Sequence, residues 1–304
     1  MKIKGLFTVL LLILSITGCL KEDLEDCPDY NVVLHFNYVY RGSGNLFTQR
    51  VENVKICIFD IPGNLVATYL KESTDLKSSS VSLKLAPGDY RIVCWGNVLA
   101  HTEVMGNNTL SDSRVFHVQR NGGASDNGDP LFYAPRIRNL SNPNADILLV
   151  TIPEVGIVEK EIDFTAAHKT VEILVKGFTD NGDMNPIIEF NHIPSGYNFT
   201  LNTLPDFLME YKQTGQYDTR AQAFSVTTFH MPLFELNTPI EMTLIRPTTG
   251  AVIHKINLRD YLANNAISLT HGDWDQITIL VEFNDLGTVV SIKPWEGSSV
   301  NPGV

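Results

Sequence analysis

The chain has little positive charge and no catalytic signature, and these absences exclude several classes of function. Its 34 acidic residues outnumber its 23 lysines and arginines, which gives a formal net charge of −11. Proteins that bind nucleic acid need basic patches for the phosphates, so we predict no nucleic-acid partner. The sequence also lacks a His-Glu-x-x-His motif, a Gly-x-Ser-x-Gly motif and a phosphate-binding glycine loop. We therefore predict that the protein is not an enzyme and has no catalytic residue.

Patterns of metal ligands are missing as well. Four histidines of the second half share no ligand spacing: His168, His192, His230 and His254. No cysteine spacing fits a zinc site. The Asp-Asn-Gly-Asp clusters at residues 126–129 and 180–183 lack the alternating ligands and distal glutamate of a calcium loop, and their residue types are typical of turns. We predict no metal site and no cofactor apart from the covalent lipid described next.

The N-terminus lacks an apolar run of transmembrane length. Residues 6–16 form an apolar run of about eleven residues, where a spanning helix needs roughly twenty. Lys2 and Lys4 precede the run, so it predicts a signal peptide. Residues 16–19 (Ile-Thr-Gly-Cys) then match the lipobox of bacterial lipoproteins, whose small residues admit the peptidase and whose thiol takes the lipid. We predict a lipidated Cys19 that holds the chain on a membrane; the alternative is an ordinary signal peptide with a chance cysteine.

The residues after Cys19 narrow the expected location. Residues 20–23 (Leu-Lys-Glu-Asp) resemble the export signal that sends lipoproteins of Bacteroidetes to the outer face of the outer membrane. A solvated linker is the alternative, because polar residues are common at a mature N-terminus. We predict a lipid-anchored, surface-exposed protein of the outer membrane.

Only four cysteines are present, which limits disulfide bonding. With Cys19 lipidated, three remain, so at most one disulfide forms and one thiol is left over. We predict a bond from Cys27 to either Cys57 or Cys94, which would pin the tether to the first domain. Cys57 and Cys94 lie in apolar runs, and the alternative is that both are plain buried thiols.

Alternating apolar residues and turn residues predict strands along the whole body. The clearest case is residues 32–40, where every second residue is apolar and His35 and Asn37 occupy the other face. Further strands are expected at residues 54–59, 65–67, 81–85, 90–95, 147–150, 170–175, 240–245, 276–283 and 289–292. Residues 284–287 (Asn-Asp-Leu-Gly) predict a hairpin, and residues 258–262 a helical turn.

This spacing of strands predicts an all-β protein with two tandem β-sandwich domains after a lipoprotein signal peptide. Residues 152–156 (Ile-Pro-Glu-Val-Gly) look like a hinge between the domains. The predicted divisions are a signal peptide at 1–18, a lipidated tether at 19–29, an N-terminal sandwich at 30–155 and a C-terminal sandwich at 156–304.

A set of short motifs resembles a known family. The motifs are Cys19, Cys27-Pro28, Phe-Asp-x-x-Gly at 59–63, Leu-x-Pro-Gly-x-Tyr at 85–90, Trp95-Gly96 and a final strand leading into Lys293-Pro294-Trp295. Together they resemble the fimbrial anchor lipoproteins of Bacteroidales, the FimB-type anchor of the major fimbrium and its minor-fimbrium counterpart. Taken singly, Gly63 and Gly88 are turn glycines and Trp95 is a core aromatic residue.

The resemblance implies transthyretin-like sandwiches and a role in holding the base of a pilus to the outer membrane and limiting fibre length. It also implies fimbrial structural subunits as partners, through addition of a strand from one protein to a sheet of the other. Cys19 is the one functional residue that transfers.

Two other functions stay open from the sequence. A stalk or tip subunit of the same pilus type would lose its N-terminal strand at a basic residue, for which Arg41 and Arg50 are candidates. A glycan-binding surface lipoprotein would need exposed tryptophans. Trp95 and Trp274 lie beside predicted strands, which leaves Trp295.

Overall fold

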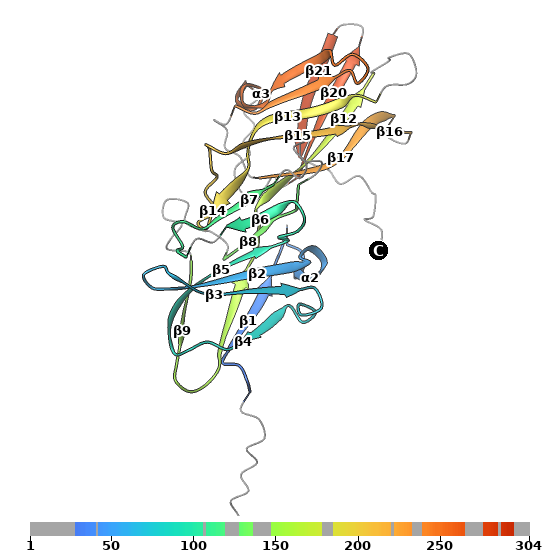
Figure 1. The fold of residues 1–304 in the computed structure, drawn as a ribbon. Helices are drawn as coiled ribbons and strands as arrows, with labels where there is room; N and C mark the ends of the chain where they lie inside the picture. Colours follow the sequence, from blue (N-terminus) through green and yellow to red (C-terminus); the bar gives the residue numbers. More distant parts are fainter. Residues whose placement is uncertain are drawn as a thin grey trace, which may run out of the picture.

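A computed structural model gives the fold of most of the mature chain (Figure 1). It describes residues 28–40, 42–105, 108–118, 128–135, 147–177, 185–219, 222–232, 239–264, 276–284 and 287–294. The predicted signal peptide, Cys19, Cys27 and both acidic clusters, apart from Gly128 and Asp129, lie outside these residues.

The first half of the chain is built from short strands and one helical turn. These are β1 (Val32–Asn37), α2 (Phe47–Arg50), β2 (Asn53–Asp60), β3 (Leu65–Glu72), β4 (Ser80–Leu83), β5 (Gly88–Gly96), β6 (Thr102–Met105), β7 (Arg114–His117), β8 (Phe132–Ala134), β9 (Leu148–Ile152), β10 (Val158–Asp163) and β11 (Thr165–Ala166).

The second half continues in the same way. It contains β12 (His168–Lys176), β13 (Ile187–Pro194), β14 (Gly196–Asn198), β15 (Leu208–Thr214), β16 (Gln216–Asp218), β17 (Ala223–Pro232), β18 (Glu241–Ile245), β19 (Val252–Asn257), α3 (Leu258–Asn264), β20 (Gln276–Asn284) and β21 (Gly287–Pro294).

Two β-sandwiches follow each other along the chain, which confirms the predicted fold class. In the first, sheet 1 (β10-β1-β4) faces sheet 2 (β11-β8-β5-β2-β3, with β9 on β5). In the second, sheet 3 (β15-β13-β18-β19) faces sheet 4 (β16-β17-β12-β20-β21). Each sandwich has its own apolar core, because residues of each strand alternate between the core and the outer face.

A fifth, three-stranded sheet joins the two halves, and we call it the bridging sheet (β14-β7-β6). Figure 1 shows β6 and β7, in green, beside β14, in yellow, between the two sandwiches. The bridging sheet covers part of the outer face of sheet 2, where a further apolar cluster forms around Trp95, Tyr133 and Tyr197. Trp95 is completely buried there, as expected for a core aromatic residue.

Strand pairing in the first half extends beyond the predicted hinge. β10 pairs in parallel with β1, and β11 pairs with β8, although both follow the predicted boundary at residue 155. Phe164 and Ala166 also pack in the first core. This pairing was not predicted, because the parallel partner of β1 is distant in sequence and leaves no local pattern.

Candidate functional site

Cys19, the predicted site of lipid attachment, and Cys27, the predicted partner in a disulfide, both lie outside the described residues. Lipidation of Cys19 and a disulfide from Cys27 therefore stay predictions. The described chain begins at Pro28, shortly before β1, so the structure locates the entry of the predicted tether into the fold.

β1 is the middle strand of sheet 1 and is hydrogen-bonded on both sides. It pairs antiparallel with β4 over residues 32–35 and parallel with β10 along its whole length. Just before the strand, Asn31 Nδ2 donates to the carbonyl of Leu85 at 2.8 Å, and the Leu85 amide donates to Asn31 Oδ1 at 2.9 Å. Ladder hydrogen bonds lie across the strand direction, so a pull along β1 loads many of them at once.

The inner face of β1 is anchored by fully buried side chains. Val32 and Leu34 have no exposed surface and Phe36 has 1%. The ring of Phe36 lies 5.1 Å from that of Phe47 on α2 and 5.5 Å from that of Phe164 beyond β10. Each such side chain contributes about 1.5–3 kcal/mol through burial. The predicted alternation of this strand is confirmed, and it makes β1 part of the core.

Cys57 and Cys94 are buried, face opposite sides of sheet 2 and form no disulfide within the described residues. Cys57 packs in the cluster beneath the bridging sheet, whereas Cys94 packs in the core of the first sandwich. Burial raises the pKa of Cys57 to about 11 and that of Cys94 well above its ordinary value. Both thiols are therefore protonated and weakly nucleophilic at neutral pH.

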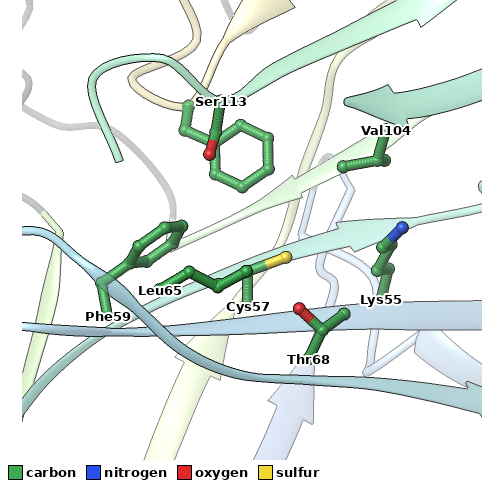
Figure 2. Close-up of a pocket in the computed structure, with 8 residues that line it drawn as sticks. Lys55, Cys57, Phe59, Leu65, Thr68, Val104 and Ser113 are labelled. Carbon is green, nitrogen blue, oxygen red and sulfur yellow. The ribbon is translucent and has the colours of Figure 1, made fainter. Parts of the chain in front are cut away.

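A pocket of about 290 Å³ opens beside Cys57, between sheet 2 and the bridging sheet (Figure 2). Its lining residues are Lys55, Cys57, Phe59, Leu65, Thr68, Val104, Ser113 and Phe199. Figure 2 shows the Cys57 sulfur between Thr68 on β3 and Val104 on β6. This volume lies at the lower end of the range of about 300–1,000 Å³ that is typical of ligand pockets, and it is large enough to take a side chain from a partner.

Three histidines meet at the joint between the two sandwiches. His117 Nδ1 lies 2.9 Å from the hydroxyl of Tyr211, and His168 Nδ1 lies 2.7 Å from the carbonyl of Leu131. The rings of His168 and His230 are 5.1 Å apart. His168 and His230 share no ligand spacing in the sequence, because the three histidines are brought together only by strand pairing between distant segments.

Burial keeps this histidine cluster uncharged. Loss of solvation, together with a smaller effect of nearby His230 and His101, lowers the pKa of His117 to about 3. The pKa of His168 is also lowered to about 3, and that of His230 to about 4, again chiefly by burial. His117 Nε2 is buried without a hydrogen-bond partner. Three neutral imidazoles thus sit where protonation would place like charges close together.

Other predicted features have a plain outcome. In the part of the chain that the structure describes, no group of three or more histidine, cysteine or acidic side chains could hold a metal ion. No helix within the described ranges is long and apolar enough to cross a membrane. Of the three tryptophans, Trp95 is buried, while Trp274 and Trp295 lie outside the described residues.

Comparison with known families gives a match over most of the chain. The sequence model of the fimbrillin-A associated anchor proteins Mfa1 and Mfa2 matches residues 24–301. A search of curated proteins finds no match.

Solved structures show the same fold at low sequence identity. The fimbrial anchor protein Mfa2 from Porphyromonas gingivalis has a TM-score of 0.62 at 15% identity, covering 87% of this chain and 97% of that one. A Bacteroides thetaiotaomicron protein described as polysaccharide-binding has a TM-score of 0.69 at 15% identity, covering 87% and 98%. A second protein from that species, described as an adhesin, has a TM-score of 0.65 at 15% identity, covering 90% and 98%. At such identities these similarities establish the fold.

Proposed function

The chain belongs to the family of fimbrillin-A associated anchor proteins, and from this premise we propose that it holds the base of a fimbria to the outer membrane through a lipid on Cys19. In this role the chain is a structural protein, and its chemistry is confined to the lipidated cysteine. Its partners are the membrane, through the acyl chains, and the fimbrial structural subunits.

The position of β1 is the observation that carries this proposal. The predicted tether leads directly into a strand that is paired on both sides and packed into the first core. Tension between a lipid at residue 19 and a fibre elsewhere on the protein would therefore act along two ladders instead of peeling one edge strand.

We further propose that fimbrial subunits bind by strand addition and that the protein helps to limit fibre length. A bound lipid would fix the anchor at the membrane, so a fibre that ends on it stops growing at that end. Strand addition supplies main-chain hydrogen bonds for affinity and side-chain pockets for specificity.

Replacement of the lipidated cysteine tests the membrane attachment. We expect Cys19→Ala to move the protein from the membrane fraction to the medium and to release fimbriae from the cells. Cys27→Ala is the matched control, because it lies in the same tether but carries no predicted lipid, and it should stay in the membrane fraction. Retention of the Cys19→Ala protein in washed membranes would contradict the proposal.

The mature N-terminus distinguishes an anchor from a stalk subunit. Cleavage after Arg41 or Arg50 would remove β1 from between β4 and β10, and after Arg50 it would also remove α2 with the buried Phe47. We expect mass spectrometry of protein taken from surface fimbriae to find a lipidated N-terminal Cys19. A start directly after either arginine would show that the chain polymerises as a subunit.

A further inference from the structure

The long edges of the sheets differ in how they are protected against further pairing. Within the described ranges, the edge strands of six or more residues are β3, β10, β15, β19 and β21. Natural proteins protect such edges with charged residues, with short strands or with covering elements, because a bare edge invites another strand. A long edge strand without such protection therefore indicates a place where a strand of another protein binds.

Four of these five edges are protected by charged residues or by a covering helix. β10 presents Glu159 and Glu161 at exposed positions. On β15, Lys212 pairs with Glu189 at 2.8 Å, and on β19 Lys255 pairs with Glu241. On β21, the carbonyl of Val290 accepts a hydrogen bond of 2.7 Å from Tyr261 on α3.

β3 is the exception. Its exposed face carries Val66, Thr68 and Leu70, with 49% and 54% of the valine and leucine exposed. Its charged residues come only at the end, as Lys71 and Glu72. The strand is eight residues long, so it offers one of the longest edges in the described protein.

The main chain of β3 is paired on one side only. Its register with β2 runs from Leu65 to Glu72. On the other side the Leu65 amide donates to the carbonyl of Asn108 at 2.6 Å, and Asn64 forms an isolated bridge with Thr109. From Val66 onward, no described strand pairs with this edge. An extended segment is the one ligand shape that could satisfy the row of amides and carbonyls there.

The pocket beside Cys57 lies on the same face of β3. Thr68 faces Cys57 across the strand pair and forms part of the pocket wall, and Leu70 stands opposite Lys55. Val66, Thr68 and Leu70 are spaced every second residue, about 7 Å apart along the strand. An added strand would lie beside the β3 residues that line the pocket and would have the same spacing, so one of its side chains could reach the pocket while its neighbours cover the exposed valine and leucine.

We propose that the free edge of β3 and the pocket beside it form a docking surface for an extended segment of a fimbrial subunit. The segment has apolar side chains at alternate positions, one of which fills the pocket, and an acidic residue that pairs with Lys55. This inference rests on the proposed function, which supplies the partner.

A second copy of this chain fits the surface less well. Two β3 strands paired about Thr68 would bring only a small threonine to each pocket. Each copy also carries a net charge of −11, which opposes association. The docking surface therefore favours a different chain, and a self-association measurement can decide between the two.

Charged substitutions on the edge test the docking surface. We use the full lipidated protein in detergent and the purified main subunit of the fibre that the cells assemble, and we measure Kd by biolayer interferometry. We expect the double variant V66K/L70K to bind at least tenfold more weakly. The matched control is V252K/V289K, which places the same charges on residues of β19 and β21 that are 60% and 50% exposed; its Kd should change less than twofold. All four positions are exposed, so both variants should keep the parent unfolding midpoint.

Each outcome separates the docking surface from the proposed function. If the parent binds the subunit and V66K/L70K binds it equally well, the docking surface is wrong and the anchor role stands. If the parent does not bind the subunit at all, the proposed partner is wrong. If light scattering shows a parent dimer that V66K/L70K converts to a monomer, the occupant is a second copy, which overturns the proposal.

Crosslinking on cells provides an independent measurement. We would replace Val66 by p-benzoylphenylalanine and irradiate cells that bear fimbriae. We expect a covalent product with the fimbrial subunit at position 66 and none at position 252. A product with a second copy of this chain, or equal products at both positions, would overturn the proposal.

Discussion

The two sandwiches bury their sheets in different ways, and the difference separates the sandwich that contains β1 from the sandwich that follows it. Sheet 2 of the first sandwich has an apolar cluster on each face, one shared with sheet 1 and one beneath the bridging sheet. In sheet 4 the central strands β12 and β20 alternate over most of their length between buried and partly exposed residues, and their buried residues from Val171 onward pack in the core of the second sandwich. The first sandwich is thus connected on one side to the predicted tether, through β1. On the other side it is connected to the second sandwich, through the bridging sheet.

This arrangement makes the joint the element that couples the two sandwiches. The hydroxyl of Tyr197 on β14 donates to the carbonyl of Ala167 at 2.6 Å, and the hydroxyl of Tyr133 on β8 donates to the carbonyl of Phe199 at 2.9 Å. Both bonds are buried. Within the described residues, tension applied to β1 would be transmitted to the second sandwich through such contacts or through the chain between β11 and β12.

Among the predicted changes, acid should cause the largest loss of stability, because the histidine cluster lies in the joint between the two sandwiches. His117, His168 and His230 have lowered pKa values in the folded protein and ordinary values near 6.5 when unfolded. Below pH 6.5 the unfolded chain takes up protons that the folded chain refuses until about pH 3–4. Stability is therefore full above pH 7 and falls as the pH drops, by up to about 1.4 kcal/mol per pH unit for each histidine. Urea unfolding at pH 7 and pH 5 measures the loss.

A variant shows whether the histidines cause this loss. Other titratable groups lie around the cluster: Asp129, His101, Lys169 and Tyr211. His117→Gln/His230→Gln should be less stable at pH 7, since the site is buried, but its stability should fall only about one third as steeply between pH 6.5 and 5. An unchanged pH slope would assign the acid sensitivity to other groups.

Local patterns in the sequence were enough to predict much of the fold. The alternation of residues 32–40 predicted β1, the turn residues at 284–287 predicted the β20–β21 hairpin, and a helical turn was expected where α3 begins. The strands predicted at residues 54–59 and 90–95 are present as β2 and β5, and the structure adds that most of their residues are buried on both faces of the sheet.

The features that make the candidate site are set by contacts between distant segments. β1 pairs with a strand more than a hundred residues away, and β7 pairs with β14 across the two halves. β6, β7 and β14 have three or four residues each, which is too short for a clear period. The exposed edge of β3 reflects the absence of a neighbouring strand among the described residues, and a strand's own residues do not encode that absence. Cys19 could be proposed from sequence alone, because a lipobox is a linear motif.

Truncation of one core phenylalanine in each sandwich should show whether the two cores unfold separately. Phe36 on β1 and Phe190 on β13 are both essentially unexposed, at 1% and 0%. Either Phe→Ala change should cost about 3–5 kcal/mol of unfolding free energy. Hydrogen exchange should rise in β4 and β10 for Phe36→Ala, and in β15 and β18 for Phe190→Ala. Equal exchange in both sandwiches for either variant would show that the two cores unfold as one unit, and the separation argued above would be wrong.

The smallest loss of stability is expected when a methyl group is added to a glycine of the bridging sheet. A Cβ at Gly196 would approach the carbonyl oxygen of Val115 on β7 within 1.9 Å, and that oxygen belongs to the backbone and cannot swing aside. Gly196→Ala should therefore shift β14 from β7 and cost about 1–3 kcal/mol. Gly44→Ala is the control, because nothing lies within 4 Å of its Cβ, and it should change stability by less than about 0.5 kcal/mol. Thermal unfolding with hydrogen exchange at β7 measures both. If Gly196→Ala matched the control, the bridging sheet would be too soft to carry load between the sandwiches, and tension from the tether would have to pass through the chain between β11 and β12.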